Sequence, residues 1–214
     1  MSTKITKQFK GIKMDNPFLD FKVKRKFAGF ISAVTHPPIV AIAAFILINY
    51  FILDWNKFLF ITSICLIFGT FLPIITALFW IKKRKIDIDM TNRFERTFPL
   101  VYAIISYLIG AAVLYILGSP PATTVLMFCY FSNTLVVLFI NHFWKISIHA
   151  MGVAGPTAAL IYVFGYYGVL FGLIIPFVMW SRVYLKKHSL YQVLAGAAYG
   201  LLVTGLQFYL LIPV

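Results

Sequence analysis

The sequence predicts an all-α integral membrane protein, built as a bundle of six to seven transmembrane helices. Three observations predict this fold class. The 214-residue chain is 61% hydrophobic and only 12% charged, which leaves far more apolar surface than a water-soluble domain can bury. Several apolar runs reach about 20 residues without a charge, the length that crosses a hydrocarbon core. The charged residues gather in a few short segments between these runs.

The formal net charge of +13 would favour nucleic acid as the partner of a water-soluble protein. In a chain of this composition, basic residues instead mark the membrane side on which loops stay, and they attract anionic headgroups. We therefore expect a phospholipid bilayer as a partner and no nucleic acid. Cys65 and Cys129 lie inside apolar runs and are expected to be buried packing residues.

The N-terminal segment, residues 1–26, carries eight Lys and Arg residues against Asp15 and Asp20. This pattern predicts a basic arm or an interfacial helix that lies on anionic headgroups. The remainder, residues 27–214, contains neither a second polar domain nor an internal repeat. We expect it to form a single transmembrane domain.

The first apolar run, residues 39–53, is shorter than the roughly 20 residues that a crossing needs. It either extends back toward Phe27 with a bend at Pro37 and Pro38, or begins at these prolines and is short. His36 is expected to be a cap or an interfacial residue. The other predicted spans are residues 58–81 with a kink at Pro73, 98–118, 122–141, 150–164, 165–180 and 190–213.

Three polar clusters, within residues 82–96, 145–149 and 181–192, each border an apolar run. Two predicted spans separate each cluster from the next, so all three face the same side of the membrane, together with the N-terminus. Of the 19 Lys and Arg residues, only Lys57 falls on the opposite side. The positive-inside rule makes the side of the clusters cytoplasmic. An active site at this membrane face is the resulting prediction.

The residue types of the clusters suit a phosphate group. Hydrolysis of a phosphate ester without a metal needs a nucleophile, a proton donor for the leaving oxygen, and positive charge on the other oxygens. His188 and His149 can divide the first two tasks. The candidates for phosphate binding are Arg182, Arg96, Lys145 and Ser147. The four His residues have no acidic neighbours at ligand spacing, so we expect neither a metal site nor another cofactor.

Two further features follow from spacing. Gln192 lies four residues after His188, so on a helix it shares a face with that imidazole and can orient it. Arg182 lies six residues before His188, which is out of phase on one helix, so a turn must separate them. Ser147 and His149 stand where the predicted span 150–164 begins, and free backbone N–H groups at a helix N-terminus favour an anion.

These clusters resemble the motifs of the type 2 phosphatidic acid phosphatase superfamily. Ser181-Arg182-x5-His188 is similar to the third motif, Ser-Arg-x5-His-x3-Asp, and Lys145-Ile-Ser147-Ile-His149 keeps the Ser and His of the second, Pro-Ser-Gly-His. Arg96-Thr-Phe-Pro99 resembles the end of the first, Lys-x6-Arg-Pro. The resemblance covers residues 82–200 and implies hydrolysis of lipid phosphates, without a metal, through a phosphohistidine. It implies His188 as the nucleophile, His149 as the general acid, and Arg182, Ser147 and an Arg of the first motif as phosphate ligands.

The sequence departs from these motifs at three points. Asp89 stands seven residues before Arg96, where the first motif has Lys; the nearest Lys is Lys85, eight residues before Arg93. Either Arg93 or Arg96 therefore remains a candidate phosphate ligand. Ile146 and Ile148 replace the Pro and Gly of the second motif. Gln192 replaces the Asp that orients the nucleophile in the third.

The expected function is a phosphohydrolase that removes phosphate from a membrane lipid phosphate or diphosphate, such as phosphatidate, phosphatidylglycerophosphate or a polyprenyl diphosphate. The alternative is a degenerate member of the superfamily that binds phospholipid headgroups or transfers phosphoryl groups to an alcohol. Release of phosphate from lipid phosphates distinguishes the two.

Overall fold

The computed structural model describes residues 17–87, 90 and 92–212, and within these residues the regular structure is entirely helical. In chain order the elements are α1 (Pro17–Val34), α2 (Pro37–Ile52), α3 (Trp55–Leu66), the π-helical turn η1 (Ile67–Phe71), α4 (Leu72–Arg84), the 3-10 turn η2 (Arg93–Arg96), α5 (Thr97–Ile116), α6 (Pro121–Phe143), α7 (Ile148–Phe164), α8 (Tyr166–Gly172), α9 (Ile175–Tyr184) and α10 (Leu190–Leu211). The all-α prediction is confirmed.

Five segments of the described chain are long and apolar enough to cross a membrane: Trp55–Arg84, Arg93–Ile116, Pro121–Phe143, Tyr166–Tyr184 and Leu190–Leu211. The bent pair of α1 and α2 adds a sixth if its two helices form one span. The predicted span 150–164 corresponds to α7, a shorter apolar helix of 17 residues. The protein is therefore a multi-pass membrane protein with five or six candidate spans, which meets the predicted number only at its lower limit.

The chain bends at Pro37 and Pro38, where the sequence predicts a bend. α1 and α2 meet at an angle of 50°. Pro37 opens α2, where its missing N–H costs nothing, and a proline disfavours the helical conformation in the residue before it. His36 accordingly has an extended backbone, with φ −59° and ψ 133°. α1 runs without a break through residues 26 and 27, so the basic segment is helical from Pro17, while residues 1–16 lie outside the described chain.

The span that contains Pro73 includes a π-helical turn, η1, which ends two residues before this proline. Proline cannot donate a backbone hydrogen bond, so the chain changes pitch just before it. In η1 the Leu72 N–H reaches back five residues to the Ile67 carbonyl, and the Ser106 hydroxyl on α5 donates to the Phe68 carbonyl at 2.7 Å. α3, η1 and α4 thus remain one continuous span of 30 residues.

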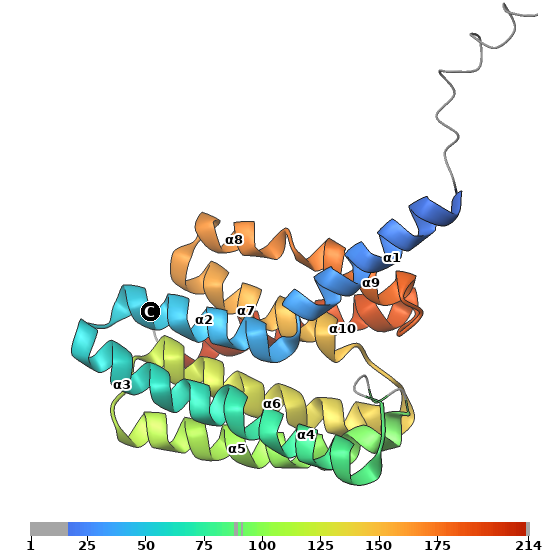
Figure 1. Ribbon diagram of the computed structural model, residues 1–214. Helices are drawn as coiled ribbons and strands as arrows, with labels where there is room; N and C mark the ends of the chain where they lie inside the picture. Colours follow the sequence, from blue (N-terminus) through green and yellow to red (C-terminus); the bar gives the residue numbers. More distant parts are fainter. Residues whose placement is uncertain (1–16, 88–89, 91, 213–214) are drawn as a thin grey trace, which may run out of the picture.

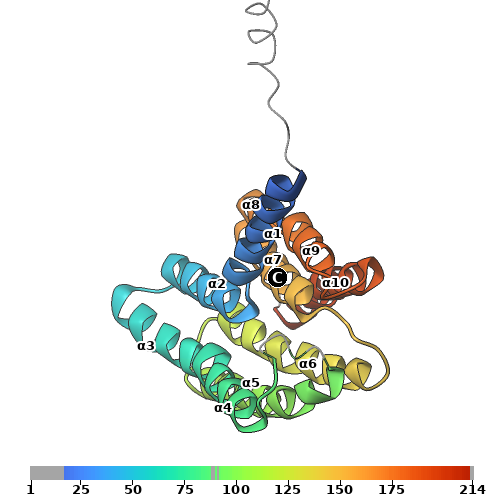
Figure 2. The ribbon, with the colours of Figure 1, turned by 45° about the vertical axis from the view of Figure 1, so that its right-hand side comes forward.

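α7 is the central helix of one half of the bundle. In Figures 1 and 2, α3 to α6 lie on one side, and α2 with α7 to α10 on the other. All residues of α7 from Ala150 to Leu160 are buried. Its main neighbour is α10, which approaches so closely that a Cβ at Gly196 would lie 2.5 Å from the Ser147 carbonyl oxygen. Small residues allow this backbone contact in a membrane, where close packing is a main force between helices.

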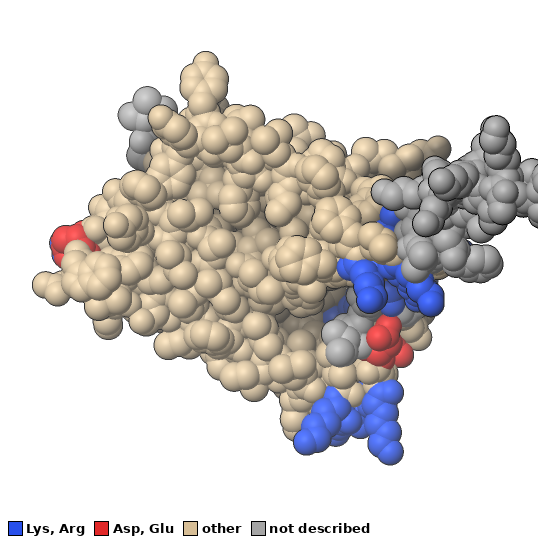
Figure 3. Space-filling model, turned by 45° about the horizontal axis from the view of Figure 1, so that its top comes forward, with Lys and Arg blue, Asp and Glu red and all other residues tan. Residues whose placement is uncertain are grey.

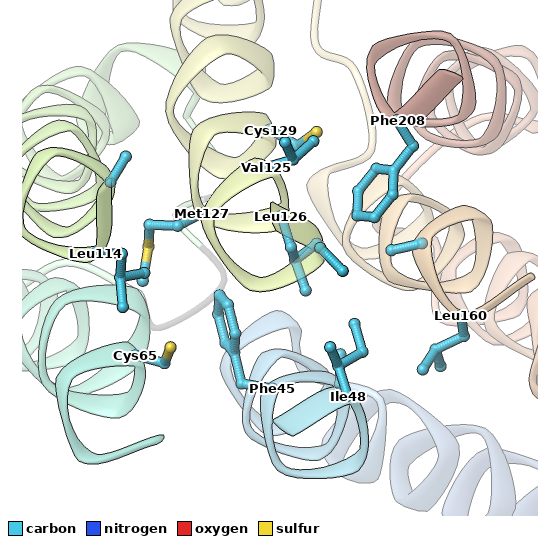
Figure 4. Packing of buried hydrophobic residues seen from close by; sticks show 14 of the residues in the cluster. Phe45, Ile48, Cys65, Leu114, Val125, Leu126, Met127, Cys129, Leu160 and Phe208 are labelled. Carbon is cyan, nitrogen blue, oxygen red and sulfur yellow. The ribbon is translucent and has the colours of Figure 1, made fainter. Parts of the chain in front are cut away.

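The largest apolar cluster surrounds α6. Figure 4 shows Leu126 and Met127 of α6 facing Phe45 of α2, with Leu114 of α5 and Phe208 of α10 alongside. Polar bonds add to this packing. Asn133 on α6 donates to Thr204 on α10 at 2.9 Å, an interhelical hydrogen bond of the kind that joins membrane helices.

The two ends of the bundle differ in charge. Among the described residues, all Lys and Arg except Lys57 lie at the end where α1, α4 and α9 carry their basic residues. Figure 3 shows these side chains on one side of the molecule. At the opposite end, Lys57 pairs with Asp54 at 3.6 Å, and the Tyr162 hydroxyl on α7 meets the Ile212 carbonyl after α10. The end of α10 therefore lies away from the basic end.

We predict that the basic end faces the cytoplasm, because retained loops carry the excess of Lys and Arg. In intact cells, a membrane-impermeant maleimide should label Asn56→Cys, at the opposite end, and should leave Lys83→Cys unlabelled until the cells are opened. Both positions are exposed, and the native Cys65 and Cys129 are buried, so background labelling should be low. Labelling of Lys83→Cys in intact cells would reverse the orientation.

Candidate functional site

A cavity of about 180 Å³ opens at the basic end of the bundle. Five parts of the chain that are far apart in sequence meet there: the junction of α1 and α2, the segment before α5, the start of α7, the end of α9 and the turn before α10. The lining residues are His36, Pro37, Pro38, Met90, Arg96, Pro99, Leu100, Ile148, His149, Arg182 and His188. The three polar clusters identified in the sequence therefore converge on one cavity.

The imidazole of His188 is held by Gln192. Its Nδ1 lies 3.0 Å from Gln192 Oε1, so the predicted contact is present, although His188 precedes α10 and does not share a helix with Gln192. The same oxygen accepts the backbone N–H of Ser189 at 3.1 Å, while the Ser189 hydroxyl accepts the Gln192 N–H. Ser189 and Gln192 form a capping box at the start of α10. One amide oxygen thus caps the helix and positions the imidazole.

This arrangement determines which nitrogen of His188 carries the proton. A backbone N–H can only donate, so the atom of Gln192 that faces Ser189 must be the oxygen. Nδ1 of His188 faces that oxygen and must therefore be the protonated nitrogen. Nε2 is left with its lone pair, the state that a nucleophile or a base requires.

The surroundings of His188 keep its ring neutral. The residue is buried, with 7% of its surface exposed. Burial, together with the positive charges of Arg96, Arg182 and Lys145, lowers the pKa of His188 from its ordinary 6.5 to about 3, and the hydrogen bond with Gln192 opposes this shift only in part. At neutral pH the imidazole is uncharged inside a positively charged cavity.

A tight turn brings Arg182 and His188 together, as their spacing predicts. α9 ends at Tyr184, and the carbonyl oxygen of Arg182 accepts the backbone N–H groups of Lys187 at 3.0 Å and His188 at 3.3 Å. Lys186 takes a left-handed conformation, with φ 56°, to reverse the chain. The main chain therefore holds His188 beside the residue that carries the guanidinium.

Arg182 is anchored by α1. Its side chain is buried, and Nη1 donates to the Ser32 hydroxyl at 2.8 Å. The neighbouring Ser181, also buried, donates to the carbonyl oxygen of Ala28 at 2.9 Å. Both contacts connect the end of α9 to one face of α1.

The start of α7 contributes His149 and a capped helix N-terminus. Ser147 is the N-cap residue, and its hydroxyl accepts the Ala150 N–H at 3.4 Å. The Ser147 N–H donates to the Gln192 carbonyl oxygen at 3.2 Å, which connects the second cluster to the third. His149 lines the cavity, whereas Ser147 is fully buried and does not.

Of the two candidate phosphate ligands of the first cluster, Arg93 and Arg96, only Arg96 lines the cavity. It is buried, and its side chain donates to the carbonyl oxygens of Met90 at 3.0 Å and Ile146 at 3.5 Å. Arg93 points toward α6, where Nη1 donates to the Phe143 carbonyl oxygen. Lys85 is exposed at the end of α4 and does not line the cavity.

Lysines stabilise the turn that carries His188. Lys145 Nζ donates to the carbonyl oxygen of Lys187 at 3.2 Å. Lys187 Nζ lies 3.7 Å from Asp87 Oδ2, across from the segment that follows α4. Lys145 therefore affects His188 in two ways: its charge lowers the pKa of the imidazole, and its hydrogen bond holds the preceding residue in the turn. Lys145 does not line the cavity.

Three residues of the site are not indicated by the sequence motifs. His36 lines the cavity, and its ring meets that of His149 edge to face, with centroids 5.0 Å apart. It occupies the N-cap position of α2 but makes no side-chain cap there. Ser32 and Met90 contact the two buried arginines. The sequence shows a single His before two prolines, but no spacing rule connects this residue to His149. Nothing in the sequence identifies Ser32 or Met90 as part of a site.

Among the described residues, no group of three or more His, Cys, Asp or Glu side chains is arranged to hold a metal ion. The positive charge that reaches the cavity wall comes from the guanidinium groups of Arg96 and Arg182. With the neutral His188 and with His149, they form a site that can bind an anion and offer it both a lone pair and a second imidazole.

No protein-family model, no curated protein and no solved structure matches this chain. Its function is therefore inferred from the chemistry of the site.

The low pKa of His188 predicts how stability depends on pH. Below pH 6.5 the unfolded chain takes up a proton on this imidazole that the folded protein does not bind until the pH falls to about 3. Stability should therefore decrease as the pH falls from 6.5, by up to about 1.4 kcal/mol per pH unit from this one group. This decrease can be measured as the change in the thermal unfolding midpoint of the detergent-solubilised protein between pH 7 and pH 4.

The variant His188→Gln provides the control, because it cannot titrate. Its unfolding midpoint should change less with pH than that of the wild type. Equal pH dependence in the two proteins would mean that His188 is not held neutral.

Proposed function

We propose that the protein is a metal-independent phosphohydrolase that removes phosphate from a membrane lipid phosphate or diphosphate. The observation that carries the proposal is the meeting of two imidazoles and two buried guanidinium groups in one cavity, with the proton of His188 held on Nδ1. The resemblance of the three clusters to the motifs of the type 2 phosphatidic acid phosphatases supports the same reading, with Gln192 in place of Asp.

Phosphate binding is assigned to Arg96 and Arg182. Their side chains are buried at the cavity wall, where a guanidinium interacts more strongly with an anion than it does in water. The N-terminus of α7, capped by Ser147, adds its dipole. The geometry favours Arg96 over Arg93 as the ligand from the first cluster. We assign Lys145 an electrostatic role and Lys85 no contact with phosphate, because neither lysine lines the cavity.

In the first step, Nε2 of His188 attacks phosphorus. The bond between phosphorus and the lipid oxygen breaks, and His149 in its protonated form gives its proton to that oxygen, so the lipid leaves as an alcohol. The positive charge that develops on His188 is delocalised over a ring whose Nδ1–H remains bonded to Gln192. The guanidinium groups stabilise the charge on the remaining phosphate oxygens.

In the second step, water attacks the phosphohistidine. His149, now neutral, accepts a proton from this water, and the bond between phosphorus and Nε2 breaks. Inorganic phosphate leaves, and His188 is neutral again. Each turnover consumes one phosphate ester and one water and yields one alcohol and one phosphate.

A lipid substrate is proposed because of the other residues of the cavity. Pro37, Pro38, Pro99, Leu100 and Ile148 give it an apolar wall at the end of a bundle of candidate transmembrane helices. A phosphate held by the arginines can thus remain attached to a hydrocarbon chain that stays in the membrane. By the distribution of basic residues, the headgroup would enter from the cytoplasmic side.

The proposal predicts phosphate release that depends on His188 and withstands chelation. Purified wild-type protein should release inorganic phosphate from at least one member of a panel of phosphatidate, phosphatidylglycerophosphate and polyprenyl diphosphate in the presence of EDTA. His188→Ala should lose this activity by at least about 10³-fold, because the nucleophile is gone. His142→Ala is the matched control, since His142 is exposed on α6 outside the cavity, and it should retain activity.

Full activity in His188→Ala would refute the nucleophile assignment, and strict dependence on Mg²⁺ would refute the metal-independent mechanism. Saturable binding of lipid phosphate without release, or transfer of phosphate to an added alcohol without hydrolysis, would replace the proposed function by headgroup binding or phosphoryl transfer.

Gln192 predicts a graded response. Gln192→Ala removes the acceptor of the Nδ1–H, so the turnover rate should fall on the order of 10²-fold. Gln192→Glu keeps both hydrogen bonds and adds a negative charge near the ring that becomes positive during attack. It should match or exceed the wild type. Steady-state rates on the best lipid phosphate compare the three proteins.

Ser189→Ala separates the two functions of Gln192. It removes the hydroxyl half of the capping box and leaves the contact between Gln192 and His188 in place. We expect a small loss of stability, about 1 kcal/mol, with the rate nearly unchanged. A loss of rate equal to that of Gln192→Ala would attribute the effect to the helix cap.

A further inference from the structure

α1 carries one face that belongs to the site and another that is strongly basic. Phe21, Ala28 and Ser32 follow the spacing of seven and four residues that places side chains on one side of a helix. This side packs on α9, which is the main neighbour of α1. The ring of Phe21 lies 6.2 Å from that of Tyr184, centroid to centroid, and Ala28 is fully buried.

The bonds between these helices reach the phosphate ligand. Ser32 accepts a hydrogen bond from the Arg182 guanidinium at 2.8 Å, and the Ala28 carbonyl accepts one from the Ser181 hydroxyl. The break at His36 and Pro37 separates α1 from α2, with a bend of 50° between them. Contacts with α9 therefore hold α1 in position. In turn, Ser32 on α1 holds the guanidinium group of Arg182 in its orientation.

Lys22 and Lys26, four residues apart, lie on another side of α1, and Lys24 and Arg25 lie between them in the sequence; all four side chains are exposed. Exposed apolar side chains, including Val23 and Phe30, lie between and after them. A helix that combines exposed basic and aromatic residues at the end of a membrane bundle is complementary to a surface of anionic headgroups. α1 lies at the basic end, beside α9 (Figures 1 and 2).

We propose that an anionic phospholipid surface is the partner of α1, and that its contact with this helix holds Arg182 in place for the phosphate. The inference rests on the proposed function, which assigns Arg182 as a phosphate ligand. When the basic residues are bound to the membrane surface, α1 stays docked on α9 and Ser32 holds the guanidinium. On a neutral surface, α1 is less firmly held, and the site binds phosphate more weakly.

Activity in reconstituted vesicles tests this coupling. Wild-type protein is placed in phosphatidylcholine vesicles with or without phosphatidylserine, and hydrolysis of the water-soluble p-nitrophenyl phosphate is measured, so that the membrane concentration of substrate plays no part. We expect kcat/KM to rise several-fold with the anionic lipid, mainly through a lower KM. Lys22→Gln/Lys26→Gln should lose most of this rise.

Two controls distinguish the effect of the charges on α1 from the effect of the total positive charge at this end of the bundle. Lys82→Gln/Lys83→Gln removes the same number of charges from exposed positions at the end of α4 and should respond to the anionic lipid like the wild type. Ser32→Ala should abolish the response while α1 keeps its charges, and Ser32→Thr, which keeps a hydroxyl, should restore part of it.

The position of α1 can be measured independently of catalysis. A Cβ at Gly29 has no neighbour within 4 Å, so Gly29→Cys can carry a spin label, with a second label at the exposed Tyr209 on α10 through Tyr209→Cys. Anionic lipid should narrow the distribution of distances between the two labels. The same narrowing should be absent from the protein that also carries Lys22→Gln/Lys26→Gln.

An unchanged distance distribution would overturn the inference, whatever the activity. An equal rise in kcat/KM in Lys22→Gln/Lys26→Gln and in the wild type would also overturn it. Narrowing in a protein that hydrolyses no phosphate ester would support the docking of α1 by anionic lipid and contradict the proposed function instead.

Discussion

The hydrogen bonds accepted by the side-chain oxygen of Gln192 are the interaction on which the rest of the site depends. That oxygen receives the Ser189 N–H and the Nδ1–H of His188 at the same time. Loss of either donor would disturb the other, because the beginning of α10 and the orientation of the imidazole share one acceptor. Since Gln192 also accepts the Ser147 N–H through its carbonyl, the start of α7 is held to the same residue.

The charged side chains of the site lie at helix ends, where the free-energy cost of burying a charge in the membrane is reduced. Buried charges in hydrocarbon are expensive, and the buried guanidinium groups here lie where η2 leads into α5 and where α9 ends. Each is bonded to main-chain or hydroxyl oxygens of another segment, Arg96 to Met90 and Arg182 to Ser32. Their summed charge in turn lowers the pKa of His188, so the positive field that suits an anion also keeps the imidazole neutral.

Periodicity and local spacing predicted the features that are determined by residues close together in the sequence. The apolar runs predicted the helices, the spacing of four residues predicted the contact of Gln192 with His188, and the spacing of six predicted the turn after Arg182. Contacts between distant segments could not be predicted in this way. Ser32 resembles any polar residue of an interfacial helix, and the choice between Arg93 and Arg96 depended on how η2 meets α6. Composition also predicted an apolar helix at residues 150–164, but it did not indicate that α7 is buried from Ala150 to Leu160.

The bond between Ser32 and Arg182 joins residues 150 positions apart, and that between Ala28 and Ser181 spans 153. Ribosomes add about 5–20 residues per second, so α1 waits on the order of 10 to 30 seconds for α9 to be made. During this time the side of α1 that carries Ala28 and Ser32 has no α9 to pack on. The cavity is thus assembled last, after nearly the whole chain has been synthesised and inserted, and a chain that stops before α9 has a membrane anchor without a site.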